Sequence, residues 1–425
     1  MGQWCAFPDF SEIKKYTGVY EARNFELFKA TLQEHHLGQQ AQNFLMASGK
    51  LQALCYKAEI EAAFRTPELD GFFLLGINDF PGQGTALVGM LNAFKQEKGY
   101  IQKSEIRKFC SPVVPLAELS RFTYKNTDQL NVNFLLSNYG PDTICASPHY
   151  WLTDELGQTI TEGQLARGCW SSGKCDSLGA ISIPLTAIHK ATRCLLSLMV
   201  GSARNSWDLW VYPQTLKFPS LPDSVRITRS WNHAIQQFLE RGGRVLLDLS
   251  GQISHGARIK SWFTPVFWNT SWFRMRPPHT LGLYIRRNHP AFNDFPTSFH
   301  SNYQWWSLIH GQQVMLIDQF PDSIQPLVQP IDTWFLNRRL AQLLEVRVGK
   351  GRLLISTLHL SANNQKPASR QLLYSLMCYI RSDQFNPKVA VSSQTIANLL
   401  TNNSNGLPHY ATSTGLPNYL KGPKE

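Results

Sequence analysis

The sequence predicts a multidomain protein of the α/β plus β class: the end of a (β/α)8 barrel, then a β-sandwich, then an α/β domain with a mainly parallel sheet. Three patterns lead to this prediction. A helical pattern precedes a buried strand near residue 71, short alternating strands begin near residue 103, and helices and strands alternate again after residue 222. We therefore expect domains at residues 1–105, 106–218 and 219–390, followed by a flexible tail at residues 391–425.

Residues 71–89 organise the first domain. A nearly uninterrupted apolar run leads to Asp79, and a turn rich in proline and glycine follows. This pattern is typical of a strand buried on both faces, which in a (β/α)8 barrel presents a site residue at its C-terminal end. Helical spacing predicts a helix before it at residues 48–67 and a closing helix at residues 86–94. Because a full barrel needs about 250 residues, residues 1–105 can form only its last repeats. Weaker helical patterns lie at residues 9–16, 24–33 and 37–46.

The second domain is predicted from alternating apolar and polar residues. Expected strands lie at residues 132–140, 149–160, 181–185 and 193–201. Leu156 and Gly157 are suited to a hairpin turn. In the segment NSWDLWVYP at residues 205–213, Trp207, Trp210 and Tyr212 either stack on sugars or pack a core or domain seam, and packing is the commoner role of such large aromatic residues.

The third domain begins after a proline-bounded linker. We expect helices at residues 231–241 and 369–380, and strands at residues 244–249, 280–285, 314–320 and 352–358. The segment from Gly349 to Gly351 is predicted to form a hairpin turn. It is not a phosphate-binding loop, because no Ser or Thr and no helix start follow the Gly-Lys-Gly sequence. A patch of histidine and aromatic residues between His289 and Trp306 indicates domain packing, with metal binding as the alternative.

Three long phrases resemble one family. They are GQWCAFPDFSEIKKYTG at residues 2–18, YKAEIEAAFRTPELDGFFLLGINDFPGQGTALVG at residues 56–89, and NSWDLWVYP at residues 205–213. They are similar to the C-terminal part of large bacterial exo-glycosidases of the family 2 glycoside hydrolase type, often described as β-galactosidase-like or sugar-binding. The resemblance covers about residues 1–390. It implies a carbohydrate substrate, a retaining mechanism at O-glycosidic bonds, periplasmic or secreted relatives, and a third domain similar to flavodoxin and to class I glutamine amidotransferases.

Retaining hydrolysis needs two carboxyl groups about 5–5.5 Å apart. The candidates in the first domain are Asp9, Glu12, Glu21, Glu59, Glu61 and Asp79. Glu59 and Glu61 stand two residues apart on a predicted helix and face different directions, so they are surface charges. Asp79 either contacts sugar or fixes the turn that follows it, and Gln3 and Trp4 are expected as further sugar contacts.

The resemblance also implies where the nucleophile belongs. In the resembled enzymes a glutamate lies just before the GQW phrase, whereas Met1 precedes Gly2 here. We therefore expect this chain to contain no catalytic residue. We also expect the missing N-terminal part of the glycosidase to be its partner. The alternative is a non-catalytic carbohydrate-binding or accessory protein. An amidotransferase-like activity of the third domain is disfavoured because the chain has no nucleophile elbow of the G-x-C-x-G or G-x-S-x-G type.

Composition and charge exclude several other classes of protein. With 43% hydrophobic and 17% charged residues, the chain is expected to fold around a substantial core. Its net charge of +11 would permit nucleic-acid binding, but the basic residues are scattered, so we expect no nucleic-acid partner. No apolar run is long enough to predict a membrane span. The eight cysteines form no C-x-x-C pair, so we expect no metal and no cofactor; they are free thiols, or Cys169 and Cys175 close a loop.

Overall fold

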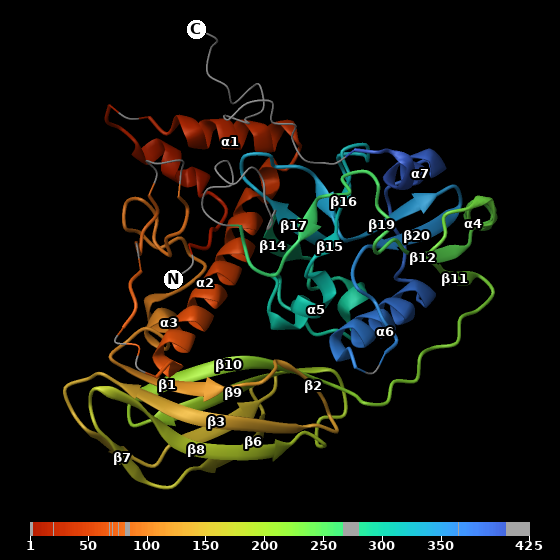
Figure 1. The fold of residues 1–425 in the computed structure, drawn as a ribbon. Coiled ribbons are helices and arrows are strands. Elements are labelled where there is room, and N and C mark those ends of the chain that lie inside the picture. The colour runs from red at the N-terminus through yellow and green to blue at the C-terminus, as the bar shows by residue number, and fades with distance from the viewer. Residues whose placement is uncertain are drawn as a thin grey trace.

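The computed structural model describes residues 3–19, 21–67, 69, 71–74, 76–80, 86–266, 280–363 and 365–404. It consists of a helical N-terminal segment, a sandwich of two β-sheets, and a C-terminal domain built on a six-stranded sheet. In Figure 1 the sandwich lies at the bottom and the C-terminal domain at the upper right. The long helix α2 (Ala41–Arg65) runs down beside that domain to the sandwich (Figure 1). The fold is therefore mixed α/β, and no sheet within the described ranges closes into a barrel.

The N-terminal segment is helical. Its elements are η1 (Phe10–Lys15), α1 (Arg23–Glu34), η2 (Gly38–Gln40), α2 and α3 (Lys103–Arg107). The helix predicted at residues 48–67 lies within α2 as far as Arg65; α2 ends two residues before Pro67, because a proline restricts the residue that precedes it. Phe7 and Phe25 share one buried core with Trp334 of the C-terminal domain. The N-terminal segment and that domain are therefore joined by a common core.

The buried strand predicted before Asp79 is not formed. Residues 71–74 and 76 have no regular structure, and the Phe73 side chain is 80% exposed. Only isolated bridges occur here, from Asn78 to Leu91 and from Phe80 to Ala86. The helix predicted at residues 86–94 is also wrong, because this stretch folds back along residues 77–80. A strand buried on both faces needs a neighbour on each side, and the described part of residues 3–105 contains no other strand to supply one.

The sandwich pairs a three-stranded sheet with a five-stranded sheet around one core. The first sheet has the order β1 (Val113–Glu118), β3 (Gln129–Asn138), β8 (Lys174–Pro184); the second has the order β2 (Thr123–Lys125), β10 (Ala203–Tyr212), β9 (Thr192–Val200), β5 (His149–Thr153), β6 (Thr159–Gln164). The predicted strand segments and the hairpin at Gly157, whose φ is 81°, are confirmed. Trp207, Trp210 and Tyr212 are all buried, so they pack the interior as the commoner reading expects.

One disulfide joins Cys145 and Cys169. These residues lie opposite each other on β4 (Ile144–Ala146) and β7 (Gly168–Trp170), which pair antiparallel. The loop suggested between Cys169 and Cys175 is therefore not closed, and Cys175 is a free thiol. Strand register, which the sequence does not display, decides which cysteine faces Cys169.

The C-terminal sheet has the order β11 (Val225–Thr228), β12 (Arg244–Asp248), β20 (Gly351–Ser356), β19 (Leu343–Val348), β17 (Val328–Asp332), β14 (Thr280–Ile285). Only the β11–β12 and β12–β20 pairs are parallel, so the expectation of a mainly parallel sheet is wrong. The hairpin predicted at Gly349 is confirmed, with Val348 paired to Gly351. A hairpin makes its two strands antiparallel, and β17 and β14 continue that arrangement.

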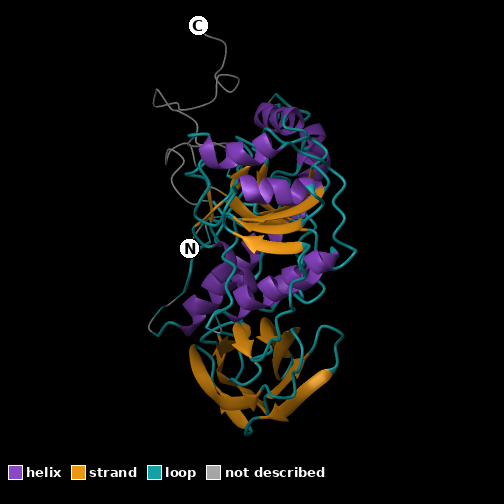
Figure 2. Cartoon of the chain, turned by 90° about the vertical axis from the view of Figure 1, so that its right-hand side faces the viewer, coloured by secondary structure: helices purple, strands orange, loops and turns teal. Residues whose placement is uncertain are grey.

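Helices lie on both sides of this sheet, as Figure 2 shows. They are α4 (His233–Glu240), α5 (Trp306–Ile309), α6 (Pro367–Arg381) and α7 (Ser393–Thr401), with the short turns η3 (Pro290–Phe292) and η4 (Tyr303–Trp305). Two-residue strands complete the domain: β13 (Lys260–Ser261), β15 (Gln312–Gln313), β16 (Met315–Leu316) and β18 (Leu340–Ala341). The expectation of a flexible tail from residue 391 is wrong for α7, because Ile396 and Leu399 of this helix are buried in the core. No helix in the described ranges is long and apolar enough to cross a membrane.

Candidate functional site

Asp79, the predicted sugar contact, lies in a buried ion pair. Its Oδ2 is 2.6 Å from Lys98 Nζ, and the two side chains are 2% and 1% exposed. Its Oδ1 accepts a hydrogen bond from the Gly89 backbone N–H at 2.9 Å. Burial raises the pKa of Asp79, and the Lys98 charge and the Gly89 N–H act in the opposite direction. In this arrangement Asp79 fixes its loop and does not face solvent.

A second buried carboxyl lies near Asp79. Glu12 is 1% exposed, and neither of its side-chain oxygens has a hydrogen-bond partner among the described residues. Burial, followed by the negative charge of Asp79, raises the pKa of Glu12 to about 7. The sequence singled out Glu12 as one carboxyl among several, and nothing in its neighbours indicated that η1 would bury it.

The other two predicted sugar contacts lie near the start of the described chain. Trp4 packs against α2, where its Nε1 donates to Glu59 Oε1 at 3.1 Å and its carbonyl accepts from Gln52 at 2.8 Å. Gln3 is partly exposed. Neither residue lines the pocket described next, and neither does Asp79. Sugar contacts by these three residues stay predictions.

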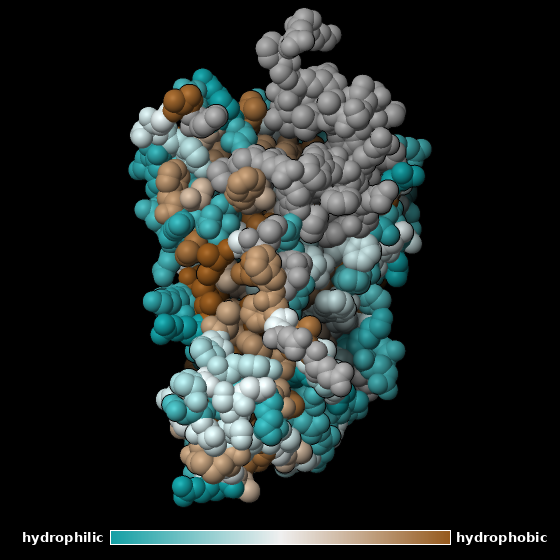
Figure 3. Space-filling view, turned by 60° about the vertical axis from the view of Figure 1, so that its left-hand side comes forward, coloured by the Kyte–Doolittle hydropathy of each residue, from teal (hydrophilic) through white to brown (hydrophobic). Residues whose placement is uncertain are grey.

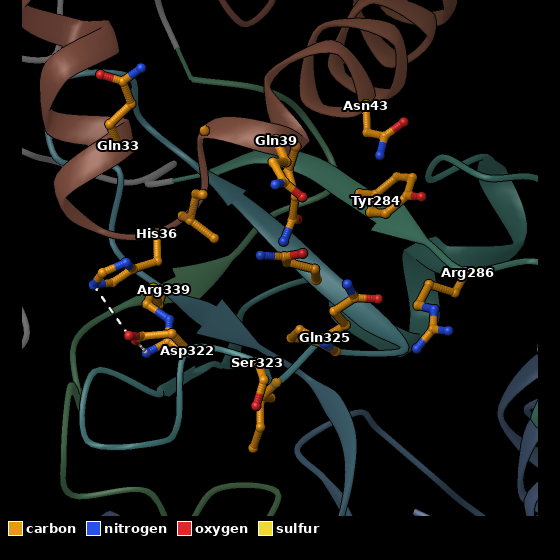
Figure 4. Close-up of a pocket in the computed structure, with 16 residues that line it drawn as sticks. Gln33, His36, Gln39, Asn43, Tyr284, Arg286, Asp322, Ser323, Gln325 and Arg339 are labelled. Carbon is orange, nitrogen blue, oxygen red and sulfur yellow. Dashed lines mark hydrogen bonds and ion pairs between the residues drawn. The ribbon is translucent and has the colours of Figure 1, made fainter. Parts of the chain in front are cut away.

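A polar hollow lies between the α1–α2 connection and the C-terminal sheet. It has a volume of about 750 Å³. Six side-chain amides line it, and we call it the amide pocket: Gln33, Gln39, Gln40, Asn43, Gln325 and Gln329. Figure 4 shows Gln39 and Asn43 on one side, Gln325 on the other, and Tyr284 beneath α2. The amides come from sequence segments about 290 residues apart, so no local motif marks the pocket.

The charges in the amide pocket are largely paired with one another. Asp322, the one carboxylate among the described lining residues, lies 3.3 Å from His36 Nε2 and 3.0 Å from Arg339 Nη1 (Figure 4). Arg339 is buried and also donates to the carbonyls of Phe320 and Pro321. His36 has a φ of 58°, a left-handed backbone conformation that is uncommon for residues other than glycine.

The amides can bond to a ligand that both donates and accepts hydrogen bonds. Each carboxamide offers a carbonyl acceptor and an NH₂ donor, which suits hydroxyl groups. Gln40 Oε1 is buried without a hydrogen-bond partner in the described chain, and such an atom is normally satisfied by a protein group, water or a ligand. The pocket therefore combines an unsatisfied acceptor with uncharged hydrogen-bonding groups.

The histidine and aromatic patch of the third domain serves packing. Phe295 and Trp305 are fully buried and belong to the core that holds α6 on the sheet. No group of three or more His, Cys, Asp or Glu side chains in the described ranges could hold a metal ion.

Two family models match parts of the chain. Both describe domains of unknown function: DUF8488 matches residues 128–213, within the sandwich, and DUF8487 matches residues 226–401, the C-terminal domain. No curated protein matches the chain.

Several solved structures are similar to part of the chain. The β-D-mannosidase of Dictyoglomus thermophilum is 13% identical, with a TM-score of 0.33, over 50% of this chain and 27% of that one. An exo-chitosanase of Amycolatopsis orientalis is 13% identical, with a TM-score of 0.26, over 41% and 19%. The alkylpurine DNA glycosylase AlkC of Pseudomonas fluorescens is 14% identical, with a TM-score of 0.21, over 24% and 30%. Glycoside hydrolases are thus among the weak structural neighbours, and this chain spans less than a third of each.

Proposed function

We propose that this protein binds a neutral saccharide in the amide pocket, as the non-catalytic C-terminal portion of a β-galactosidase-like glycoside hydrolase of the family 2 type. The observation that carries the proposal is the set of six side-chain amides around one hollow of about 750 Å³. Pockets of roughly 300–1,000 Å³ hold small molecules. A saccharide presents hydroxyl groups in several directions, and amides from opposite walls can meet them.

Most charges of the pocket are paired with one another, which favours an uncharged ligand at the end where Asp322 lies. Asp322 is neutralised by Arg339 and faces His36, so neither carboxylate nor guanidinium is left to attract an ion at that end. Arg286 lies at the other edge (Figure 4) and can donate to hydroxyl oxygens. Tyr284 adds a ring on which the apolar face of a sugar could pack.

The same residues argue against hydrolysis in this pocket. A retaining glycosidase needs an acid/base and a nucleophile, both of them carboxyl groups. The described lining residues include one carboxylate, Asp322, and its oxygens are engaged by Arg339 and His36. We accordingly propose that the acid/base and the nucleophile of such a glycosidase lie outside the amide pocket.

The remaining part of such a glycosidase would cover an apolar surface. Large exposed apolar side chains concentrate in one segment of the chain: Leu69, Phe73, Ile77, Phe80 and Phe94. Figure 3 shows brown, hydrophobic surface on the side where the N-terminal segment lies. Exposed apolar patches often mark interaction sites. We propose that the segment formed by these residues packs against the N-terminal part of the glycosidase.

The proposal is tested by titrating the full chain with neutral disaccharides, such as lactose, mannobiose and cellobiose, in a calorimeter. We expect binding of at least one of them. Gln39→Ala with Gln325→Ala should weaken it about tenfold, because each net hydrogen bond contributes about 0.5–1.5 kcal/mol. Both side chains are exposed, so the variant should keep its fold.

Gln394→Ala is the matched control, because this exposed glutamine lies on α7 outside the pocket. It should bind as the parent protein does. Unchanged affinity in the double variant, or the absence of binding by every disaccharide at millimolar concentration, would overturn the proposal.

A further inference from the structure

A second hollow lies where α2, the sandwich and the C-terminal domain meet. It consists of two adjoining pockets of about 340 and 500 Å³, which share Lys57, Lys108, Arg193 and Asn302 among their lining residues. We call the two together the junction cleft. None of its lining residues belongs to the amide pocket.

The junction cleft is rich in cations. Six basic side chains line it: Lys50, Lys57, Arg65, Lys108, Arg193 and Arg287. They come from α2, the end of α3, strand β9 and the turn after β14. The cleft exists only because the three parts of the fold meet, so its basic character cannot be seen in any one segment of the sequence.

The carboxylates of the cleft already have partners. Asp208 accepts from Arg193 at 2.8 Å and from Asn302 Nδ2 at 2.9 Å, which also ties the sandwich to η4. Glu61 is paired with Lys57 and accepts from Trp207 Nε1 at 2.9 Å.

The remaining carboxylate of the cleft is Glu105. It lies 3.3 Å from Lys50 and accepts from the backbone N–H of Gln102, where it caps α3. Each carboxylate is thus offset by a cation of the cleft, and none is left to neutralise a further one.

Two cations are left without a counter-charge. Neither Lys108 nor Arg287 has a side-chain hydrogen bond or ion pair within the described chain, and both line the same pocket. Arg287 is exposed and Lys108 is half-buried. A guanidinium and an ammonium on the wall of one cleft are the groups that bind carboxylate, sulfate or phosphate oxygens.

The basic residues of the cleft also affect the buried side chain of His300, which lines the same pocket. It is 9% exposed, and its Nδ1 has no hydrogen-bond partner among the described residues. Burial lowers the pKa of His300 to about 3, and the charges of Lys50, Arg193 and Arg287 act in the same direction. The imidazole is therefore neutral, and it adds no charge of its own to the cleft.

The second of the two pockets offers an aromatic wall. Phe122 of the sandwich and Tyr303 of η4 stack with their ring centroids 3.7 Å apart. Trp207 lines the same pocket, with Lys57 Nζ 5.0 Å from its ring centroid. Because Phe122 and Phe263 both stack on Tyr303, a ring-shaped ligand could contact the edges of these rings at one end of the cleft while an attached oxyanion reaches the cations at the other.

We propose that the junction cleft binds an acidic saccharide, with its oxyanion held by Lys108 and Arg287 and its ring against Phe122 and Tyr303. Both this proposal and the proposed function concern a saccharide ligand, but they rest on different residues. An experiment can therefore overturn one of them and leave the other standing. It gives the protein a second site that selects for negative charge.

The test uses the full chain and four probes: D-glucuronate, D-glucose, inorganic sulfate and inorganic phosphate. We expect D-glucuronate to bind at least about tenfold more tightly than D-glucose, with an affinity that falls as salt is added, because added ions screen exposed charges. Inorganic sulfate and phosphate should bind more weakly than D-glucuronate, since they lack the ring. Equal binding of a free inorganic anion would overturn the assignment of a saccharide.

Variants separate this site from a general charge effect. Lys108→Gln with Arg287→Gln should lower the affinity for D-glucuronate about tenfold or more, because each removes a charge-assisted hydrogen bond. Lys388→Gln, an exposed lysine outside the cleft, should leave the affinity unchanged. Gln39→Ala with Gln325→Ala should also leave it unchanged. Retained affinity in the Lys108 and Arg287 double variant, or an equal loss in Lys388→Gln, would overturn the proposal.

Discussion

Asp79 and Lys98 form an ion pair closed off from solvent, with Asp79 Oδ2 2.6 Å from Lys98 Nζ. The same lysine donates to the Gly89 carbonyl at 2.9 Å, and Asp79 accepts from the Gly89 N–H. The pair therefore holds together three points of a stretch that has almost no regular secondary structure. The pair thereby links residues 76–80 to residues 86–98, where no neighbouring strands do so.

Removing one partner of this pair should be costly. Asp79→Asn leaves the Lys98 ammonium buried without its partner. Lys98→Met leaves the Asp79 carboxyl buried without its partner. An uncompensated buried charge costs about 3–5 kcal/mol of unfolding free energy. We expect each single variant to lose stability in denaturant unfolding, and the double variant Asp79→Asn/Lys98→Met to recover most of the loss. Additive losses in the double variant would contradict a direct pairing.

The backbone of Gly89 provides an independent test of the same loop. A Cβ at Gly89 would lie 2.2 Å from the carbonyl carbon of Asn78 and from the nitrogen of Asp79, so the loop must shift to accept it. We expect Gly89→Ala to lower the melting temperature by several degrees, since overpacking costs about 1–3 kcal/mol. Gly71→Ala is the control, because no atom lies within 4 Å of its Cβ. Equal melting temperatures for the two variants would show that the close approach is not required.

Glu12 should make stability depend on pH. Its pKa is raised from 4.5 to about 7, so the folded protein binds this proton more tightly than the unfolded chain does. Its contribution to stability is therefore fully present below the unfolded pKa and is lost as pH rises through the folded pKa. We expect Glu12→Gln to gain stability relative to the parent between about pH 5 and about pH 8, by more than about 1 kcal/mol.

Denaturant unfolding at a series of pH values measures this effect. Glu34→Gln, at an exposed position of α1, should follow the pH profile of the parent protein. A Glu12→Gln profile parallel to that of the parent would show that Glu12 titrates normally.

The disulfide should stabilise the sandwich. Cys145 and Cys169 close a loop with a sequence separation of 24 residues, and chain-entropy arguments assign a loop of this size about 3 kcal/mol. We expect Cys145→Ser to lower the unfolding free energy by about that amount under oxidising conditions, and to have little effect once the parent protein is reduced. Cys175→Ser removes a free thiol and serves as the control.

The chain should hydrolyse glycosides weakly or not at all. Its predicted strand-end carboxylate, Asp79, is held in an ion pair, and Asp322 in the amide pocket has no carboxylate partner among the lining residues. Loss of proton transfer alone commonly reduces a rate by about 10² to 10⁴. The measurement is turnover of a panel of aryl β-glycosides. Turnover at ordinary glycosidase rates, abolished by Asp79→Ala, would show a complete site within this chain.

Local patterns determined much of the secondary structure. The helix at residues 48–67 and the sandwich strands were predictable because apolar residues recur at helical or alternating spacing in those segments. The turns at Gly157 and Gly349 were predictable because each glycine stands between two strand patterns, and in the structure both adopt a positive φ, which glycine tolerates without strain. The burial of Trp210 followed from its size and its place in a strand.

Only the tertiary structure decided which strands and sites exist. An apolar run such as residues 71–78 forms a buried strand when neighbouring strands bond to its backbone, and it takes another path when they are lacking. Asp79 is consequently sequestered by Lys98, which nothing in its local sequence indicates. Likewise, Gln39 faces Gln325 and Lys108 lines the same cleft as Arg287 because distant segments fold together, so the polar and charged character of both hollows was fixed by long-range packing.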